Sequence, residues 1–162
     1  MKNLQKWGNM RNKPIRKYKG TEKILVSESH IRVRYADTDQ MKMVYHSKYF
    51  EYFEQGRSDL LRGVGIPYPE IEKMGYYLPV VEAHARFIKS GHYDDLLLVK
   101  SMLTEIPSAR VTIEYAIMNS QKELIAVGYT IHSFVSVKSG KPCRPPRRFM
   151  EIIESKLKTG PR

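Results

Sequence analysis

The stretch YADTDQMKMVYHSKYFEYF, residues 35–53, contains the change of pattern that decides the fold. Before it, apolar and charged side chains alternate with the period of two that is typical of a half-buried strand, in Ile31, Arg32, Val33, Arg34 and Tyr35. Further on, side chains recur at spacings of three and four, which predicts a helix packed on a sheet, in Phe50, Phe53, Arg57, Leu60, Leu61 and Val64. Asp39 precedes this helix, whose unpaired N–H groups and positive dipole end can hold an anion. We therefore expect a carboxylate and an anion-binding helix end to face one pocket.

The rest of the chain predicts a sheet around this helix. We expect the helix over 47–62, ended by Gly63, Gly65 and Pro67, and strands over 27–36, 78–88, 96–105, 109–118 and 124–137. The turn NSQKE makes the last two strands an antiparallel pair, and a short helix closes the chain. The sequence thus predicts an α+β domain in which an antiparallel five-stranded sheet wraps one long central helix. Strand edges of this length leave surface for a partner, so we expect a homodimer or homotetramer.

Length and composition narrow the class of protein. A chain of 162 residues with 41% hydrophobic content suits one globular domain. The single cysteine, Cys143, excludes an intrachain disulfide and a cysteine-only metal site, and its position in the turn KPCRPP favours an incidental thiol over a nucleophile. The apolar runs are too short to span a bilayer and the first residues lack the apolar core of a signal peptide, so we expect a cytoplasmic location.

The net charge of +11 is concentrated at the two ends of the chain. Residues 1–23 contain eight lysines and arginines and one glutamate, whereas residues 24–137 have a slight acidic excess. We expect residues 1–26 to form a basic, flexible arm and residues 27–160 to form the domain. Basic tails attract nucleic acids and membranes, but charge alone is weakly specific, so we favour a solvated tail.

Several motifs, taken in order, carry a family resemblance. They are Tyr35-Ala36-Asp37-Thr38-Asp39, then Val44-Tyr45-His46 with Tyr49, Phe53 and Glu54, then Pro79-Val80-Val81-Glu82, then Tyr93-Asp94-Asp95, and a basic, proline-bearing close after Gly140. This series resembles the hotdog-fold acyl-CoA thioesterases of the 4-hydroxybenzoyl-CoA thioesterase and Tol-Pal-associated type. The resemblance covers roughly residues 28–157. It implies a hotdog fold and hydrolysis of an acyl-CoA thioester to a free acid and coenzyme A.

The resemblance also implies catalytic groups. By position, Asp39 is the catalytic carboxylate, acting as nucleophile or as general base, while Asp37 is a turn or structural residue. The backbone N–H of His46 is the implied oxyanion donor, aided by the helix dipole. Two alternatives concern the same residues: an aspartate before a helix is often a cap, and the His46 imidazole could itself be a base. We favour a catalytic Asp39 and the backbone of His46.

Other residues are candidates for binding the substrate. Tyr45 and Tyr49 could contact it or belong to the core, and Glu82 shares a strand face with His84, so that a carboxylate–histidine pair is conceivable. The phosphates of coenzyme A call for cations at the pocket mouth, for which the candidates are Lys89, Arg110 and Arg144. No further cluster of His or Cys supports a metal site, so we predict no metal and no cofactor, coenzyme A being part of the substrate.

One position departs from the family pattern, and two rival functions follow from the same fold. Many relatives have glycine where this chain has Lys42; if that position needs positive φ the lysine strains the loop, and if not it places a cation near Asp39. A hotdog hydratase or dehydratase would need the pattern Asp-x-Asn-Pro-x-His, which is absent here. A non-catalytic acyl-CoA sensor would retain its ligand without turnover, but the chain has no recognisable DNA-binding motif.

Overall fold

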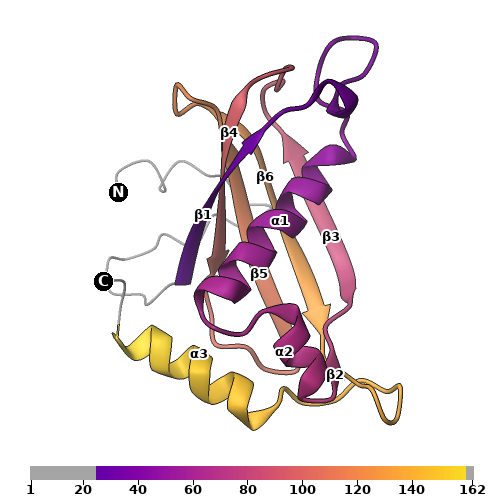
Figure 1. Ribbon diagram of the computed structural model, residues 1–162, viewed down its shortest axis with the longest axis vertical. Helices are drawn as coiled ribbons and strands as arrows, with labels where there is room; N and C mark the ends of the chain where they lie inside the picture. The colour runs from indigo at the N-terminus through magenta and orange to yellow at the C-terminus, as the bar shows by residue number, and fades with distance from the viewer. Residues whose placement is uncertain (1–24, 160–162) are drawn as a thin grey trace.

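The computed structural model describes residues 25–159, which form an antiparallel sheet with a long helix across one face (Figure 1). The strands lie in the order β1-β4-β5-β6-β3, namely β1 (Leu25–Arg32), β3 (Val80–Phe87), β4 (Leu96–Leu103), β5 (Arg110–Met118) and β6 (Leu124–Ser133). The long helix is α1 (Lys48–Gly63), which contacts β1, β3, β4 and β5. The predicted α+β architecture, five antiparallel strands around one central helix, is confirmed.

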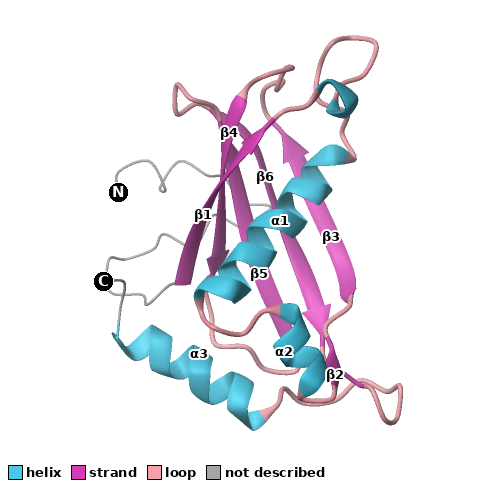
Figure 2. Ribbon diagram, in the orientation of Figure 1, coloured by secondary structure: helices cyan, strands magenta, loops and turns pink. Residues whose placement is uncertain are grey.

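Shorter elements complete the described part of the chain (Figure 2). They are the 3-10 turn η2 (Tyr35–Asp37), α2 (Tyr68–Lys73), β2 (Tyr76–Tyr77), β7 (Val135–Ser136) and α3 (Arg147–Thr159). Within residues 25–159 no helix combines the length and apolar character needed to cross a membrane. Residues 1–24, nearly all of the predicted basic arm, lie outside the described residues, and the last two residues of that predicted arm, Leu25 and Val26, begin β1.

Some strands end earlier than the alternating pattern predicts. β1 stops at Arg32, and the N–H of Arg34 donates to the carboxylate of Asp37 (3.0 Å). A side chain that accepts from a backbone N–H in this way competes with strand pairing, so the chain turns into η2. The predicted strand 124–137 is divided into β6 and β7, because β6 pairs with β3 and β5 whereas β7 pairs with β2. The predicted strand 78–88 corresponds to β3 alone.

The first half of α1 lies very close to the sheet. Phe53 is fully buried and stacks on Tyr115 of β5, with ring centroids 4.4 Å apart. Gly128 of β6 makes this approach possible, since a Cβ there would overlap both the Phe53 ring and the carbonyl oxygen of His84. The start of α1 is thereby held at a fixed height above β5 and β6.

A chain of hydrogen bonds runs under the second half of α1 through five residues, Arg57, Tyr68, Tyr115, Thr130 and His132. The hydroxyl of Thr130 lies 2.7 Å from that of Tyr115 and 2.9 Å from Nε2 of His132, which is fully buried. Burial, together with the charge of Arg57, lowers the pKa of His132 to about 4. His132 is therefore neutral at pH 7, and its Nδ1 lies 3.2 Å from the carbonyl oxygen of Leu78.

Candidate active site

Asp39 lies in a narrow loop whose two arms are paired through their backbones. Thr38 forms a bridge with Val44, and the N–H of Asp39 donates to the carbonyl of Met43 (2.9 Å). The Asp39 oxygen Oδ1 accepts from the N–H of Met41 (2.9 Å) and of Met43 (3.3 Å). Its other oxygen, Oδ2, accepts no hydrogen bond from any residue of the described range. The loop thus fixes the carboxyl group through one oxygen and leaves the second available for chemistry.

Lys42 stands at the tip of this loop in a left-handed conformation, with φ of 62°. Its N–H donates to the carbonyl of Asp39 (2.9 Å), which closes the turn. This is the position where many family members have glycine, a residue that adopts positive φ without steric cost. Of the two readings of this departure, the structure supports the strained loop.

The residues directly before α1 offer backbone N–H groups that no described residue accepts. The N–H groups of Lys48 and Tyr49 already donate within the first turn, to the carbonyls of Tyr45 (2.9 Å) and His46 (3.4 Å). The N–H groups of His46 and Ser47 donate no hydrogen bond within residues 25–159. They lie at the positive end of the helix dipole, where an oxyanion is stabilised. The imidazole of His46 packs against the ring of Tyr45, with centroids 4.3 Å apart.

A cavity of about 400 Å³ is lined by the loop, the start of α1 and the end of β3. Figure 1 shows that these three segments lie at the same end of the sheet. The predicted site residues among those that line it are Asp39, Tyr45, His46, Tyr49 and Lys89. The wall is otherwise mainly apolar, from Met41, Met43, Val44, Phe87 and Ile88, with Ser90 beside them. The lining therefore combines the Asp39 carboxylate and His46, whose N–H has no acceptor among the described residues, with an apolar wall that suits an acyl group.

Tyr49 serves the core and the cavity at once. It is almost fully buried, its hydroxyl oxygen accepts from the N–H of Gly91 (3.3 Å), and its ring lies 5.1 Å from that of Phe87. Burial raises the pKa of this phenol. Tyr49 thus stays protonated at neutral pH and acts as a wall of the cavity.

The remaining predicted residues lie outside the cavity. In the register of the sheet, Val80 pairs with His132 and Arg110 with Ser133, at the end of β6. Phe87, which lines the cavity, pairs with Ala126 near the start of β6. Glu82 and Arg110 therefore lie toward the end of the sheet that is far from the cavity. Arg144 lies at that same end, because the N–H of the preceding residue, Cys143, donates to the carbonyl of Phe134. Sequence position alone gave no sign of this, because it does not tell which end of the sheet a residue occupies.

The predicted charged residues Lys89 and Glu82 already have partners in the folded protein. Lys89 lines the cavity but forms an ion pair with Glu123. Glu82 and His84 both contact Tyr129, which donates its hydroxyl to Glu82 and stacks its ring on His84 (5.2 Å between centroids). No cluster of three or more His, Cys, Asp or Glu side chains suited to a metal ion occurs in the described part of the chain.

Two features of the site go beyond what the sequence predicted. Phe87, Ile88 and Ser90 form a wall of the cavity, although they follow the loop by more than forty residues in the chain. Asp37, expected as a turn or structural residue, is buried and accepts hydrogen bonds from Arg34 and from Tyr52 of α1. An acidic residue three positions after the start of a turn, as Asp37 is to Arg34, was the available signal for the second feature.

Comparison with known proteins places the chain in a class. Residues 33–153 match the family model of the thioesterase-like superfamily, and the chain belongs to this family. The membership confirms the hotdog fold and the class predicted from the sequence, a thioester hydrolase.

Individual relatives agree with this class. The chain is 34% identical over 124 residues to Bacillus subtilis YneP, provisionally named an acyl-CoA thioesterase, covering 76% of this chain and 90% of that protein. It is 30% identical over 91 residues to the acyl-CoA thioesterase YbgC of Haemophilus influenzae, covering 56% of this chain and 67% of that protein. The solved DHNA-CoA thioesterase of Staphylococcus aureus is 31% identical and superposes with a TM-score of 0.75, covering 83% of this chain and 90% of that one.

Proposed function

We propose that this protein hydrolyses an acyl-CoA thioester to a free acid and coenzyme A, with Asp39 as the catalytic carboxylate. One observation carries the proposal: a single cavity is lined by Asp39, whose Oδ2 accepts no hydrogen bond from the described residues, and by the start of α1, where the N–H groups of His46 and Ser47 have no partner among those residues. Hydrolysis of a thioester needs both a group that delivers the nucleophile and a donor for the oxygen that becomes negative.

Two routes are open to Asp39. In the first, Oδ2 attacks the thioester carbonyl, coenzyme A leaves as a thiolate that takes a proton from water, and a second water hydrolyses the resulting anhydride. In the second, the carboxylate takes a proton from a water molecule as that water attacks the same carbonyl, and the proton then passes to the leaving thiolate. In both routes the carbonyl oxygen becomes an anion, which the N–H of His46 stabilises from the positive end of α1.

The cavity wall supports an apolar acyl group as the part of the substrate that enters. Met41, Met43, Phe87 and Ile88 provide apolar surface, and the flexible methionine side chains can adapt to acyl groups of different shape. Of the three predicted phosphate-binding cations, Lys89 is the one at the cavity rim, and substrate binding would have to compete with its ion pair to Glu123. We propose no metal and no cofactor, because either route uses only the carboxylate, water and backbone donors.

The test is release of thiol from a panel of short, long and aromatic acyl-CoAs by the wild type and by Asp39→Asn. We expect wild-type turnover and a loss of at least about 100-fold in kcat for the variant, with coenzyme A binding retained. Asp94→Asn is a matched control, since Asp94 is exposed, does not line the cavity and has a positive φ that asparagine tolerates. Binding without turnover would instead support an acyl-CoA sensor, and hydration of an enoyl-CoA would support a hydratase.

We also propose that the protein is a homodimer formed through β3, or a homotetramer of such dimers. Within the described sheet β3 has a neighbour, β6, on one edge alone. Apolar side chains remain exposed along it, with 46% of Val80, 51% of Val81 and 48% of Phe87 accessible. An exposed apolar edge strand invites pairing with another chain, and a two-fold axis would pair two copies of β3 antiparallel. Because Phe87 also lines the cavity, the second copy would lie beside the active site.

Sedimentation analysis tests this assembly. We expect a dimer or tetramer for the wild type and a shift toward monomer for Val81→Glu, which puts a charge on the paired edge. A monomeric wild type would contradict the proposal. The cytoplasmic location stays a prediction that cell fractionation can test, and contact of the basic arm with nucleic acid or membranes is not part of the proposed function.

A further inference from the structure

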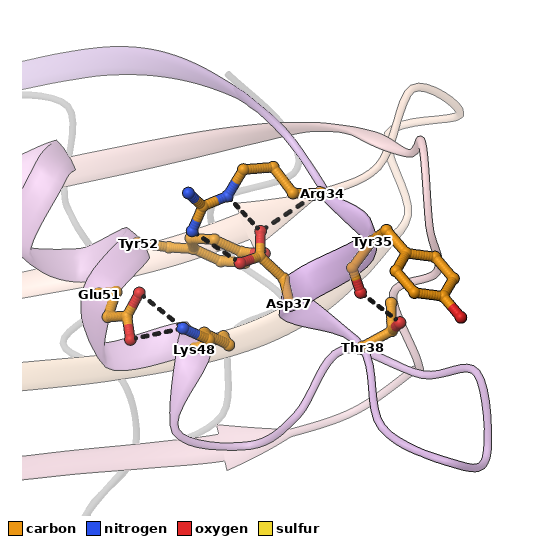
Figure 3. Close-up of polar contacts among 7 residues, drawn as sticks. All are labelled: Arg34, Tyr35, Asp37, Thr38, Lys48, Glu51 and Tyr52. Carbon is orange, nitrogen blue, oxygen red and sulfur yellow. Dashed lines mark hydrogen bonds and ion pairs between the residues drawn. The ribbon is translucent and has the colours of Figure 1, made fainter.

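The carboxyl group of Asp37 is the most completely bonded acidic group near the cavity. It is 1% exposed. Its Oδ2 accepts from the N–H of Arg34 (3.0 Å), from Nε of Arg34 (3.3 Å) and from the hydroxyl of Tyr52 (3.1 Å). Its Oδ1 accepts from Nη2 of Arg34 (2.9 Å), and Figure 3 shows these contacts beside the start of α1. Burial of a carboxylate is costly unless its oxygens are paired in this way.

These bonds connect the strand side of the fold to α1. Arg34 belongs to the segment that follows β1, while Tyr52 belongs to α1 and is itself buried. The Arg34 contacts outweigh the cost of burial and keep the pKa of Asp37 below its usual range, so the group is ionised at neutral pH. Asp37 is therefore a permanent link between the two elements that flank the catalytic loop.

The backbone of Asp37 reaches both halves of the proposed catalytic machinery. Its carbonyl oxygen accepts from the N–H of Tyr45 (2.8 Å), the residue directly before His46. Two residues further along the chain is Asp39, and Thr38 between them pairs with Val44. The second arm of the loop has a separate anchor, since the N–H of Val44 donates to the carbonyl of Gly91 (2.8 Å). The first arm, which carries Asp39, is fixed to α1 through Asp37.

We propose that Asp37 is a positioning residue that, through the hydroxyl of Tyr52, sets the separation between the Asp39 carboxylate and the N–H groups at the start of α1. This inference rests on the proposed function of Asp39. Catalysis by a fixed carboxylate and a fixed oxyanion donor depends on their separation, and a displacement of about 1 Å can cost about 100-fold in rate. A cap that only stabilised the turn would have no such effect on the folded enzyme.

Tyr52→Phe is the most selective test, because it removes one hydrogen bond and keeps the ring that packs against Tyr49. We expect kcat to fall by about 10- to 100-fold with KM changed less than about threefold. Glu51→Gln is a matched control, since it removes the ion pair with Lys48 (2.9 Å) in the same turn of α1 without touching Asp37. Asp37→Asn is expected to show the larger kcat loss, and Tyr52→Phe keeps the test valid if that variant does not fold.

Combining substitutions separates positioning from general stability. In an Asp39→Asn background, Tyr52→Phe should leave the residual kcat unchanged, because the group that it positions is already absent. If Tyr52 had a purely structural role, Tyr52→Phe would lower kcat by the same factor in the wild-type and Asp39→Asn backgrounds, or would leave kcat of the folded enzyme at the wild-type value. Either result would overturn the inference. Absence of wild-type turnover would refute the proposed function and with it this inference, whereas an active wild type with a fully active Tyr52→Phe refutes the inference alone.

Discussion

Replacing His132 by asparagine should make the stability of the protein less sensitive to acid. The folded protein holds the pKa of His132 at about 4 instead of its ordinary 6.5, because the ring is buried near Arg57. The unfolded chain therefore binds a proton at a higher pH than the folded one, and the stability from neutral His132 is complete above pH 6.5 and is lost as the pH falls to 4. A pKa difference of this size corresponds to about 3 kcal/mol.

The measurement is the free energy of unfolding in urea at pH 7, 5.5 and 4, at one protein concentration. His132→Asn should be less stable than the wild type at pH 7, because asparagine cannot replace the contacts with both Leu78 and Thr130. The difference between the two proteins should then shrink by about 3 kcal/mol toward pH 4, while acid effects common to both, such as protonation of Asp37, cancel. A difference that stays constant over this range would refute the argument that His132 is held neutral.

Substitutions at His46, Lys42 and Gly128 test other features of the site and fold. His46→Ala should keep kcat within about tenfold, whereas His46→Pro, which removes the N–H, should lose about 100- to 1000-fold in thiol release; equal losses would instead identify the imidazole as the active group. Lys42→Gly should raise the free energy of unfolding by up to about 1 kcal/mol with kcat unchanged, and a decrease would contradict strain at φ 62°. Gly128→Ala should cost about 1–3 kcal/mol in urea unfolding by overlap with Phe53, while Gly63→Ala, with open space around it, should not destabilise.

The features that could be predicted from the sequence are those set by local periodicity. The spacing of Phe53, Leu60 and Leu61 predicts which face of α1 is buried, and each of these side chains is less than 5% exposed. The ends of strands were harder to predict from the sequence, because they depend on hydrogen bonds of individual side chains. Asp37 ends the extended segment by accepting from the N–H of Arg34, and an alternating pattern contains no sign of such a bond.

Prediction of the site was limited by contacts between distant segments. The loop around Asp39 and the start of α1 are adjacent in the chain, so their shared position could be anticipated. Phe87 comes to the same cavity because the order of strands places β3 at the sheet edge beside α1, which no local pattern encodes. Arg110 could not be placed for the same reason, since the register against Ser133 puts it at the other end of the sheet.

The way in which the loop holds Asp39 has a consequence for how the specificity of the protein can evolve. Met41 and Met43 hold the carboxyl group through their N–H groups, while their side chains line the cavity. Nearly any amino acid supplies the same N–H, so these two positions can change without moving the carboxyl oxygen that we propose to be catalytic. Single substitutions at these positions can thus change the preference for the acyl group without changing the position of the carboxyl group. A combinatorial library at positions 41 and 43 should therefore yield many active enzymes with altered substrate ranges.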